Sequence, residues 1–233
     1  MTNPTGSVPL QELLASLFPP FVVVEAAGPG DDDASLLPPE ESRWLAPMAP
    51  VRRREFAMGR NAARRALGRL GLPSVVIGRR EEDRDPVWPE GIVGSISHTH
   101  GVAVAACARA GDVLAIGLDV ERAGPLGDDI VREICRDEEL EALRNVDSPH
   151  PSDWPKLLFA VKEAGYKAWF PRTRTPLEFH AMHATLDPGA RCFSATVHHA
   201  ATAHLSDAPW LLEGRFGWNA EVVLAGAVIR RVD

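Results

Sequence analysis

One segment, residues 113–121, constrains the fold more than any other because it combines a strand pattern with two carboxylates. Apolar residues alternate along it with a second set that ends in two acids, Leu114, Ile116, Leu118 and Val120 against Val113, Ala115, Gly117, Asp119 and Glu121. Successive side chains of a strand point to opposite faces, so the first set would be buried and the second would lie on the other face. The chain therefore needs a sheet, with Asp119 and Glu121 projecting side by side near the end of one strand.

The two acids of this strand could hold a cation. Residues two apart on a strand lie roughly 7 Å apart at Cα, so the side chains of Asp119 and Glu121 can converge. Mg²⁺ prefers oxygen ligands and is often held by one or two carboxylates together with a substrate phosphate. Two solvated acids at the end of a strand would have the same spacing, and the spacing alone leaves both interpretations open.

Helix and strand patterns surround this segment. They predict helices over 53–70, 130–143 and 154–170, and strands over 75–77, 92–97, 102–108, 177–187, 191–198, 211–218 and 221–229. Prolines make the N-terminal region irregular, with room only for short helices, and indicate a linker over 145–155; Pro171 is expected to end the last helix. No internal repeat is visible, and mixed helices with antiparallel strands indicate the α+β class.

Charge is distributed unevenly along the chain. The formal net charge of −7 argues against general binding to nucleic acid. Residues 52–80, however, contain nine arginines and a single acid, Glu55. Arg53, Arg60 and Arg64 fall on one side of the predicted helix. This excess of eight positive charges predicts a site for an anion, or an unusual exposed helix face.

The helix predicted over 154–170 carries few charges on an apolar background. Glu163 and Lys167 are four residues apart, and as a surface pair they would stabilise the helix by about 0.3–0.5 kcal/mol. Because the rest of this helix is strongly apolar, its charged positions, Lys162 included, are expected to face something particular. Gly165 in mid-helix costs about 1 kcal/mol relative to Ala and can mark the close approach of a backbone or a ligand.

A second anion-binding candidate lies at the end of the strand predicted over 92–97. Residues 94–98 are small and end in His98, a composition that suits an anion held by backbone N–H, hydroxyl and ring donors. His98 and His100 lack a third ligand of suitable spacing for a metal site, and a loop histidine without function is the ordinary alternative. Fingerprints such as GxGxxG, GxxxxGK[ST] and GxSxG are absent from the sequence.

Cysteine usage and hydropathy bear on the compartment. Cys107, Cys135 and Cys192 form no CxxC pair, which predicts buried thiols and neither a disulfide framework nor a zinc site. No apolar run reaches the length of a membrane span, and the first ten residues lack the pattern of a signal peptide. We therefore expect a cytoplasmic protein without a membrane partner.

Taken in order, these motifs resemble one family, the Sfp-type 4′-phosphopantetheinyl transferases, in particular the branch similar to enterobactin synthase component D. The resemblance runs from about residue 35 to 180 and rests on RRREF at 52–56, GR at 59–60, AAR at 62–64, WP at 88–89, GSISH at 94–98, GLDVE at 117–121, LF at 158–159 and KEAGYK at 162–167. Two positions depart from it. Ala160-Val161 replaces a Ser-Ala or Cys-Ala pair, and Pro176 stands where relatives can place an aromatic residue against the pantetheine arm.

The resemblance implies an activity and a set of site residues. The family transfers the phosphopantetheine arm of coenzyme A to a serine of a carrier protein and releases 3′,5′-ADP. By this resemblance Asp119, Glu121 and Glu163 bind Mg²⁺ with the coenzyme A pyrophosphate. Glu163 is the base for the serine hydroxyl, and Lys162 and Lys167 neutralise phosphate charge, Lys167 nearest the pyrophosphate. The residues that bind the adenosine 3′-phosphate and neighbouring groups, by the same resemblance, are Arg52, Arg60, Arg80, Ser97 and His98.

The resemblance also implies an architecture and partners. Two similar α/β lobes with small, mainly antiparallel sheets, about 1–118 and 119–233, are related by a pseudo-two-fold axis and form a single unit. Coenzyme A and Mg²⁺ lie in the cleft between the lobes. The partners are apo acyl or peptidyl carrier domains of siderophore, polyketide or non-ribosomal peptide pathways, with no nucleic acid, and the protein is a monomer.

Two other functions stay open. The chain could bind coenzyme A or a carrier protein without turnover, although all three carboxylates and both lysines are present. It could also be a Mg²⁺-dependent phosphoesterase or nuclease that uses the same acids with the arginine-rich helix. A nuclease would show a steep dependence on salt concentration.

Overall fold

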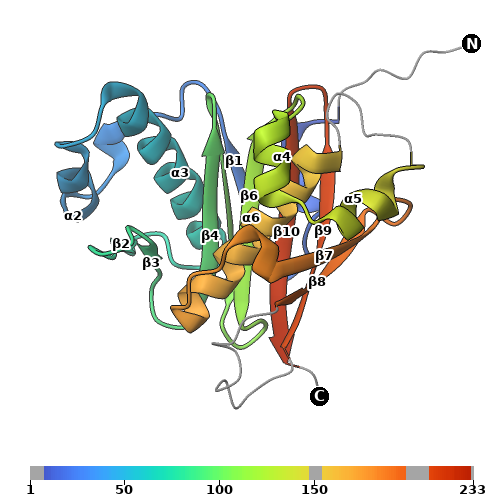
Figure 1. Ribbon diagram of the computed structural model, residues 1–233. Coiled ribbons are helices and arrows are strands. Elements are labelled where there is room, and N and C mark those ends of the chain that lie inside the picture. Colours follow the sequence, from blue (N-terminus) through green and yellow to red (C-terminus); the bar gives the residue numbers. More distant parts are fainter. Residues whose placement is uncertain (1–7, 147–153, 198–209, 232–233) are drawn as a thin grey trace, which may run out of the picture.

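The computed structural model describes residues 8–146, 154–197 and 210–231 (Figure 1). Its helices are α1 (Leu10–Ala15), α2 (Pro39–Ser42), α3 (Pro50–Arg69), α4 (Asp128–Ile134), α5 (Asp137–Leu143) and α6 (Trp154–Thr173). Its strands are β1 (Val23–Ala27), β2 (Gly78–Arg79), β3 (Pro86–Val87), β4 (Ile92–Thr99), β5 (Val102–Arg109), β6 (Ala115–Arg122), β7 (Met182–Asp187), β8 (Cys192–Val197), β9 (Trp210–Trp218) and β10 (Val222–Arg231). Short 3₁₀ turns lie at Ala34–Leu36, Arg43–Leu45 and Phe179–Ala181.

The same succession of elements occurs twice along the chain. A strand is followed by a short helix and a 20-residue helix, then by a hairpin and two longer strands: β1, α2, α3, β2–β3, β4 and β5, and again β6, α5, α6, β7–β8, β9 and β10. The second half has one more short helix, α4, between β6 and α5. In both halves the first strand pairs antiparallel with the last, β1 with β5 and β6 with β10. The structure confirms an α+β protein of two similar lobes with small antiparallel sheets.

The two lobes divide between two strands. β5 ends at Arg109 in the sheet β1-β5-β4, and β6 begins at Ala115 in the sheet β6-β10-β9-β8-β7. The division expected near residue 118 falls inside β6, which pairs with β10 from Ala115 to Arg122. We therefore refer to residues 8–109 as the first lobe and to residues 115–231 as the second lobe.

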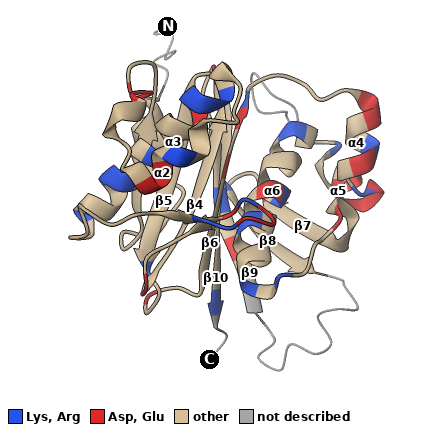
Figure 2. Cartoon of the chain, turned by 90° about the vertical axis from the view of Figure 1, so that its left-hand side faces the viewer, with Lys and Arg blue, Asp and Glu red and all other residues tan. Residues whose placement is uncertain are grey.

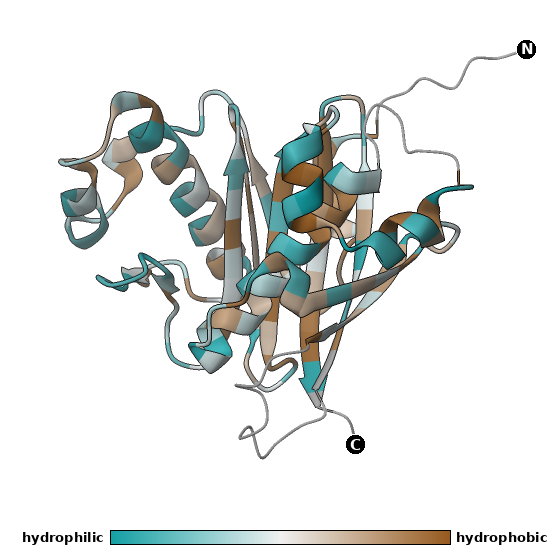
Figure 3. Ribbon diagram, in the orientation of Figure 1, coloured by the Kyte–Doolittle hydropathy of each residue, from teal (hydrophilic) through white to brown (hydrophobic). Residues whose placement is uncertain are grey.

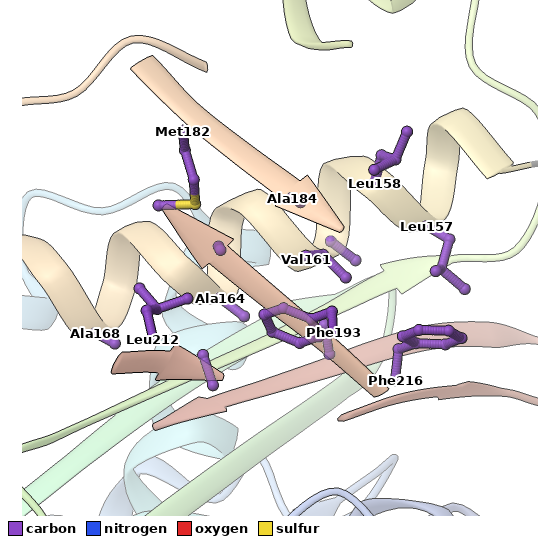
Figure 4. Close-up of a cluster of buried hydrophobic side chains, with 14 of the residues drawn as sticks. Leu157, Leu158, Val161, Ala164, Ala168, Met182, Ala184, Phe193, Leu212 and Phe216 are labelled. Carbon is purple, nitrogen blue, oxygen red and sulfur yellow. The ribbon is translucent and has the colours of Figure 1, made fainter. Parts of the chain in front are cut away.

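Helix α6 packs closely on the second sheet. Figure 4 shows Val161, Ala164 and Ala168 on the face of α6 that is turned toward the strands. A Cβ atom at Gly117 of β6 would lie 1.7 Å from the carbonyl oxygen of Ala164, so only glycine permits this approach. The close packing sets how far apart the charged residues of α6 and β6 can be. What approaches Gly165 is the side chain of Met182 in β7, and not the backbone or ligand that its mid-helix position predicted.

A shared apolar cluster joins the lobes on the other face of β6. Ile116, Leu118 and Val120 are buried there with residues of α1, β1, β5 and β10. Residues 115–120 are therefore buried on both faces of the strand. Asp119 is buried too, although the alternating pattern placed it on the face opposite the apolar residues. In Figure 3 the strands are mostly pale or brown, whereas α4 and α5 alternate between teal and brown, as helices with one buried face do.

Several local predictions were wrong. The strand β1 lies in the region expected to be irregular. The short strand expected over 75–77 is found instead at 78–79, as β2. The helix predicted over 130–143 is two helices, because Arg136 is an N-cap whose backbone N–H is bonded by Glu139. Pro171 lies within the last turn of α6. Most of the linker expected over 145–155 lies outside the described residues, and Trp154 already begins α6.

Two further observations concern the thiols and the helices. Cys107 and Cys135 are buried free thiols, as predicted, but Cys192 is only partly buried. None of the helices in the described ranges is both long and apolar enough to cross a membrane.

Candidate functional site

The edge strands β4 and β6 meet at the junction of the lobes, and serine hydroxyls connect them. The backbone N–H of Leu118 donates to Ser95 Oγ at 3.0 Å, and that of Val120 donates to Ser97 Oγ at 3.3 Å. Both serines are buried. The predicted anion-binding serine, Ser97, is thus part of the contact between the lobes.

Ser97 also connects the predicted acid of β6 with the predicted lysine of α6. Its hydroxyl donates to Asp119 Oδ1 at 3.0 Å and accepts from Lys167 Nζ at 3.0 Å. Lys167 Nζ lies 2.6 Å from Asp119 Oδ1, and the Asp119 side chain is 3% exposed. A charge-assisted contact this short is strong in a buried site. Ser97, Asp119 and Lys167, which are distant in sequence, therefore form one cluster. Lys167 pairs with Asp119, and not with Glu163 as the alternative of a helix-surface pair required.

The other two predicted acids face the same region. Burial, and then the charge of Asp119, raises the pKa of Glu121 to about 7, although Lys156, 4.0 Å away, opposes the shift. Burial also raises the pKa of Glu163, and Lys167 and Asp119 act on it in opposite directions. Carboxylates that repel one another in a partly buried site favour binding either a proton or a cation.

The residues at this cluster fit a divalent cation. Asp119 Oδ2 is buried and has no hydrogen-bond partner, and a buried oxygen of this kind is costly unless something binds it. Two more carboxylates, Glu121 and Glu163, are close enough to interact with Asp119. Within the described residues, however, no group of three His, Cys, Asp or Glu side chains is placed so that it could hold a metal ion by itself. A cation bound to Asp119 would therefore need further ligands from water or substrate, as Mg²⁺ commonly has.

Two arginine-rich cavities lie in the first lobe beside this cluster. The larger, of about 420 Å³, is lined by Trp44, Pro47, Met48, Arg52, Arg79, Arg80, Glu81 and Arg84. The smaller, of about 160 Å³, is lined by Arg52, Glu55, Phe56, Gly59, Arg60, Arg84, Asp85, Pro86, Ile96 and His98. Arg52 and Arg84 line both. His98, which lines the smaller cavity, is close enough to Lys167 and Asp119 for their charges to act on its pKa, so this cavity lies near the acidic cluster.

The electrostatics of the cavities suit a polyanion. Burial, and then the charges of Arg84 and Arg52, lowers the pKa of Arg79, so cations are crowded there. The buried Nε of Arg80 has no hydrogen-bond partner. Arg52 bonds the ring of His98, and burial together with Arg52 lowers the pKa of His98. A neutral imidazole and crowded guanidinium groups are arranged to receive negative charge.

Most of the other arginines in the basic stretch have partners within the first lobe. Arg64, Arg65 and Arg69 pair with acids from the N-terminal region, such as Glu25 and Glu41. Arg53 donates to backbone carbonyls before α3. The positions of Arg53 and Arg64 on the helix suggested a single anion-binding face. The partners of these arginines show that the excess of eight positive charges does not form such a face.

Arg60 lines the smaller cavity, but its guanidinium is engaged in the protein. It is 4% exposed, lies 3.5 Å from Glu41 and donates to the carbonyls of Ile77 and Gly78. Burial lowers its pKa to about 10. Arg60 thus fixes the loop that begins β2, and its predicted contact with a 3′-phosphate stays a prediction without support from these contacts.

Lys162 does not reach the cluster. It is 1% exposed, and its ammonium lies 2.7 Å from Glu139 and donates to the carbonyls of Ile134 and Phe179. The helical periodicity turns Lys162 away from Glu163 and Lys167, toward α4 and α5. Its charge is compensated inside the second lobe, and its predicted role in neutralising phosphate stays a prediction without support from these contacts.

Trp44, Arg79 and Arg84 line the cavities but were not predicted as site residues. Arg79 lies in the basic stretch, but only its neighbour Arg80 was predicted to bind the 3′-phosphate region. Arg84 adopts a φ of 66° in the loop between β2 and β3, which no sequence pattern indicated. A larger cavity, of about 700 Å³, lies between the segment after α1 and the outer face of the second sheet, away from the acidic cluster.

Together these features define a class of protein: one with two related lobes, an acidic cluster where they meet and arginine-lined cavities in the first lobe. Comparison with known proteins gives the family. Residues 40–108 match the model of the 4′-phosphopantetheinyl transferase N-terminal domain, and residues 115–223 match that of the 4′-phosphopantetheinyl transferase superfamily.

Individual relatives agree with the family models. The chain is 42% identical to 4′-phosphopantetheinyl transferase Svp of Streptomyces mobaraensis over 188 residues, 78% of this chain and 75% of the relative. It is 35% identical to PptT of Mycobacterium tuberculosis over 178 residues, 75% and 78% of the two chains. Enterobactin synthase component D of Salmonella typhi is 33% identical over 128 residues, 54% and 51% of the two chains. The chain belongs to the 4′-phosphopantetheinyl transferases, a family of enzymes.

Proposed function

We propose that the protein transfers the 4′-phosphopantetheine arm of coenzyme A to a serine of acyl or peptidyl carrier domains, in a Mg²⁺-dependent reaction that releases 3′,5′-ADP. One observation carries the proposal: Asp119 and Lys167 form a buried cluster with an unpartnered carboxylate oxygen, directly beside cavities lined by arginines. Coenzyme A carries a diphosphate and a 3′-phosphate, which match these two neighbouring charge environments.

Each residue of the cluster has a role in this proposal. Asp119, Glu121 and Glu163 would hold Mg²⁺, which would supply charge neutralisation for the leaving diphosphate. Lys167 contacts the pyrophosphate and orients Asp119. Glu163 accepts the proton of the carrier serine as its oxygen attacks the pantetheine-bearing phosphorus, and the bond from that phosphorus to 3′,5′-ADP breaks. Burial raises the pKa of Glu163, whereas a bound Mg²⁺ would lower it, so the role of base is proposed from the place of Glu163 beside Asp119 and Lys167.

The cavities of the first lobe hold the rest of coenzyme A. Arg52, Arg80 and His98 receive the adenosine 3′-phosphate and its neighbours, with Arg79 and Arg84 added by their positions in the cavity walls. Direct contacts with coenzyme A are not assigned to Arg60 and Lys162, which have buried partners elsewhere.

A mass measurement tests this function. An apo carrier domain incubated with the protein, coenzyme A and Mg²⁺ should gain one phosphopantetheine. Glu163→Gln and Asp119→Ala should each reduce the rate by about a thousandfold or more, as expected when a base or a charge-stabilising group is lost. Glu133→Gln, an exposed change on α4, is the matched control and should have no effect.

The outcomes of this assay separate the alternatives. No transfer to any of several carriers would contradict the proposal. Tight binding of coenzyme A without transfer would indicate a binding protein, and hydrolysis of a phosphate ester without a carrier would indicate a phosphoesterase.

The pathway and the cellular context are also part of the proposal. The likeness to an enterobactin synthase component supports a siderophore carrier as one substrate, beside polyketide and non-ribosomal peptide carriers. Comparing kcat/KM across a panel of such carriers would identify the preferred one. We propose further that the protein acts in the cytoplasm as a monomer, which fractionation and light scattering would test.

A further inference from the structure

A set of ion pairs joins the second lobe to the first through residues outside the acidic cluster. Arg174 directly follows α6 in the second lobe, and its Nη1 lies 2.8 Å from Asp83 and 3.1 Å from Asp85. Both aspartates lie in the loop between β2 and β3 of the first lobe. Figures 1 and 2 show this loop reaching from the side of α3 toward the C-terminal end of α6. One arginine thus binds two acids of the other lobe.

The two acids flank a residue of the proposed coenzyme A site. Arg84, which lines both cavities, lies between Asp83 and Asp85 in the sequence. Holding the carboxylates on both sides fixes the backbone that carries Arg84. The loop has internal bonds as well, from the N–H of Arg80 to the carbonyl of Asp85 and from the N–H of Asp85 to the side chain of Asp83.

The charge balance of the loop depends on Arg174. Burial, and then the charge of Asp83, raises the pKa of Asp85, and Arg174 is the first group that opposes this shift. The side chains of Arg174, Asp83 and Asp85 are 38%, 22% and 26% exposed, so the contacts are partly shielded from water. Without Arg174 the two acids would repel each other and would compete for the neighbouring cavity arginines.

The backbone at Arg174 is unusual for an arginine. Its φ is 57°, in the left-handed region that helix ends commonly give to glycine. The side chain also lies over the ring of Phe170, 5.4 Å from its centroid, and Phe170 stacks on Tyr166. The arginine is therefore tied to the helix that carries Glu163 and Lys167, at a position where a side chain is conformationally costly.

We propose that Arg174 is a positioning residue for coenzyme A: by binding Asp83 and Asp85 it holds Arg84 and the β2–β3 loop in place against α6. The inference rests on the proposed function, and it assigns to Arg174 no contact with substrate or with Mg²⁺. The first lobe then presents its cations at a fixed distance from the carboxylates of the second.

The test uses Arg174→Gly, because glycine suits the backbone at this position and removes only the side chain. It should raise the KM for coenzyme A about five- to tenfold while kcat at saturating coenzyme A stays within about twofold. The melting temperature should change by no more than a few degrees, since relief of the backbone offsets the lost ion pairs. Arg174→Lys should restore part of the affinity.

The chain offers a matched control. Arg191 also has a positive φ, 51°, but it lies in the turn between β7 and β8 and packs on Trp218. Arg191→Gly should leave the KM for coenzyme A unchanged. Asp83→Asn with Asp85→Asn should raise KM as Arg174→Gly does, and the triple variant should show no further loss.

Two results would overturn the inference: an unchanged KM in Arg174→Gly, or an equal rise in Arg191→Gly. Calorimetric titration with 3′,5′-ADP, which needs no carrier, should show the same weakening. If the unaltered protein transfers nothing, the proposed function fails. If it transfers normally while Arg174→Gly binds coenzyme A as tightly as before, the positioning role alone fails.

Discussion

The two lobes share an internal ion pair at corresponding places. In each lobe a short helix before the long helix supplies a fully buried carboxylate, Glu41 of α2 and Glu139 of α5. Each carboxylate binds a buried cation of the long helix, Arg60 in α3 and Lys162 in α6. The repeated succession of elements is thus accompanied by a repeated ion pair.

The correspondence extends to the chain beyond the long helix. Glu41 accepts the backbone N–H of Ile77 before β2, and Glu139 accepts that of Ala184 in β7. Each buried acid therefore ties the long helix to the hairpin that follows it. The sequence shows no repeat because the residues of the pair differ in type and spacing between the lobes.

What differs between the lobes is the charge that reaches the cleft. The first lobe presents arginines, among them Arg52 and Arg84, whereas the second presents Glu121 and Glu163 with Lys167. The shared ion pair holds both frames rigid, so the surfaces at the cleft could diverge. Under the proposed function, one lobe would hold the phosphates of coenzyme A while the other would hold Mg²⁺ and the base.

Breaking the ion pair in each lobe is the strongest test of this comparison. Glu139→Ala leaves Lys162 buried without a counter-charge and should reduce the free energy of unfolding by about 3–5 kcal/mol. Glu41→Ala should cost about 2–4 kcal/mol, since Arg64 is 22% exposed and can reach water. Urea unfolding measures both. Glu139→Gln with Lys162→Met should recover most of the loss; failure to do so would contradict the role assigned to this pair.

A second test compares glycines at helix–sheet contacts. Gly117→Ala places a methyl group against the backbone of Ala164 and should cost about 3 kcal/mol, because α6 must move. Gly59→Ala in α3 meets only a side-chain methyl of Ile96, 2.8 Å away. The better helix propensity of alanine, about 1 kcal/mol, should offset that contact. Equal losses in thermal unfolding would show that the two helices are packed alike.

The third test concerns pH. Glu121 keeps its proton to about pH 7 in the folded protein and releases it near pH 4.5 when unfolded. The corresponding stabilisation is fully present below pH 4.5 and should be lost as the pH rises to 7, by roughly 2–3 kcal/mol in the presence of a chelator. Glu121→Gln should flatten this profile. Mg²⁺ should raise the melting temperature at pH 8 in the unaltered protein and much less in the variant.

The last test leaves stability unchanged and follows the thiols. Cys107 reports on the first lobe and Cys135 on the second, and both are buried, whereas Cys192 is partly exposed. Because one apolar cluster spans both lobes, the two buried thiols should become reactive together as denaturant is raised. Cys192 should react in the native protein. Mass spectrometry of pulse-labelled protein would reveal separate transitions if the lobes unfold independently.

The sequence predicted the elements that have strong local patterns. The strand that carries Asp119 and Glu121 and the helix that carries Glu163 and Lys167 were found from alternation and from helical periodicity. β1 was not predicted although residues 21–24 read Phe-Val-Val-Val. The many prolines of the N-terminal region indicate irregular structure and conceal this short apolar run. The interruption near Arg136 depends on a capping contact that apolar periodicity does not register.

The site was predicted by residue type better than by residue role. Arg60 and Lys162 belong to motifs of the family, and both are charged residues on helices that carry site residues. Which way each side chain points is decided by its buried partner, Glu41 or Glu139, which lies 19 or more positions away in the sequence. Arg174 was missed for a similar reason, since its partners come from the other lobe.

The strand β6 has a practical consequence. It pairs within the second sheet, yet its apolar face is covered by α1, β1 and β5. A chain cut between residues 109 and 115 would give two fragments that each expose a large apolar surface, although each matches a family model of its own. Such fragments should aggregate when produced separately and should reassemble when co-expressed. The protein is therefore a candidate for a split reporter whose halves become active only together.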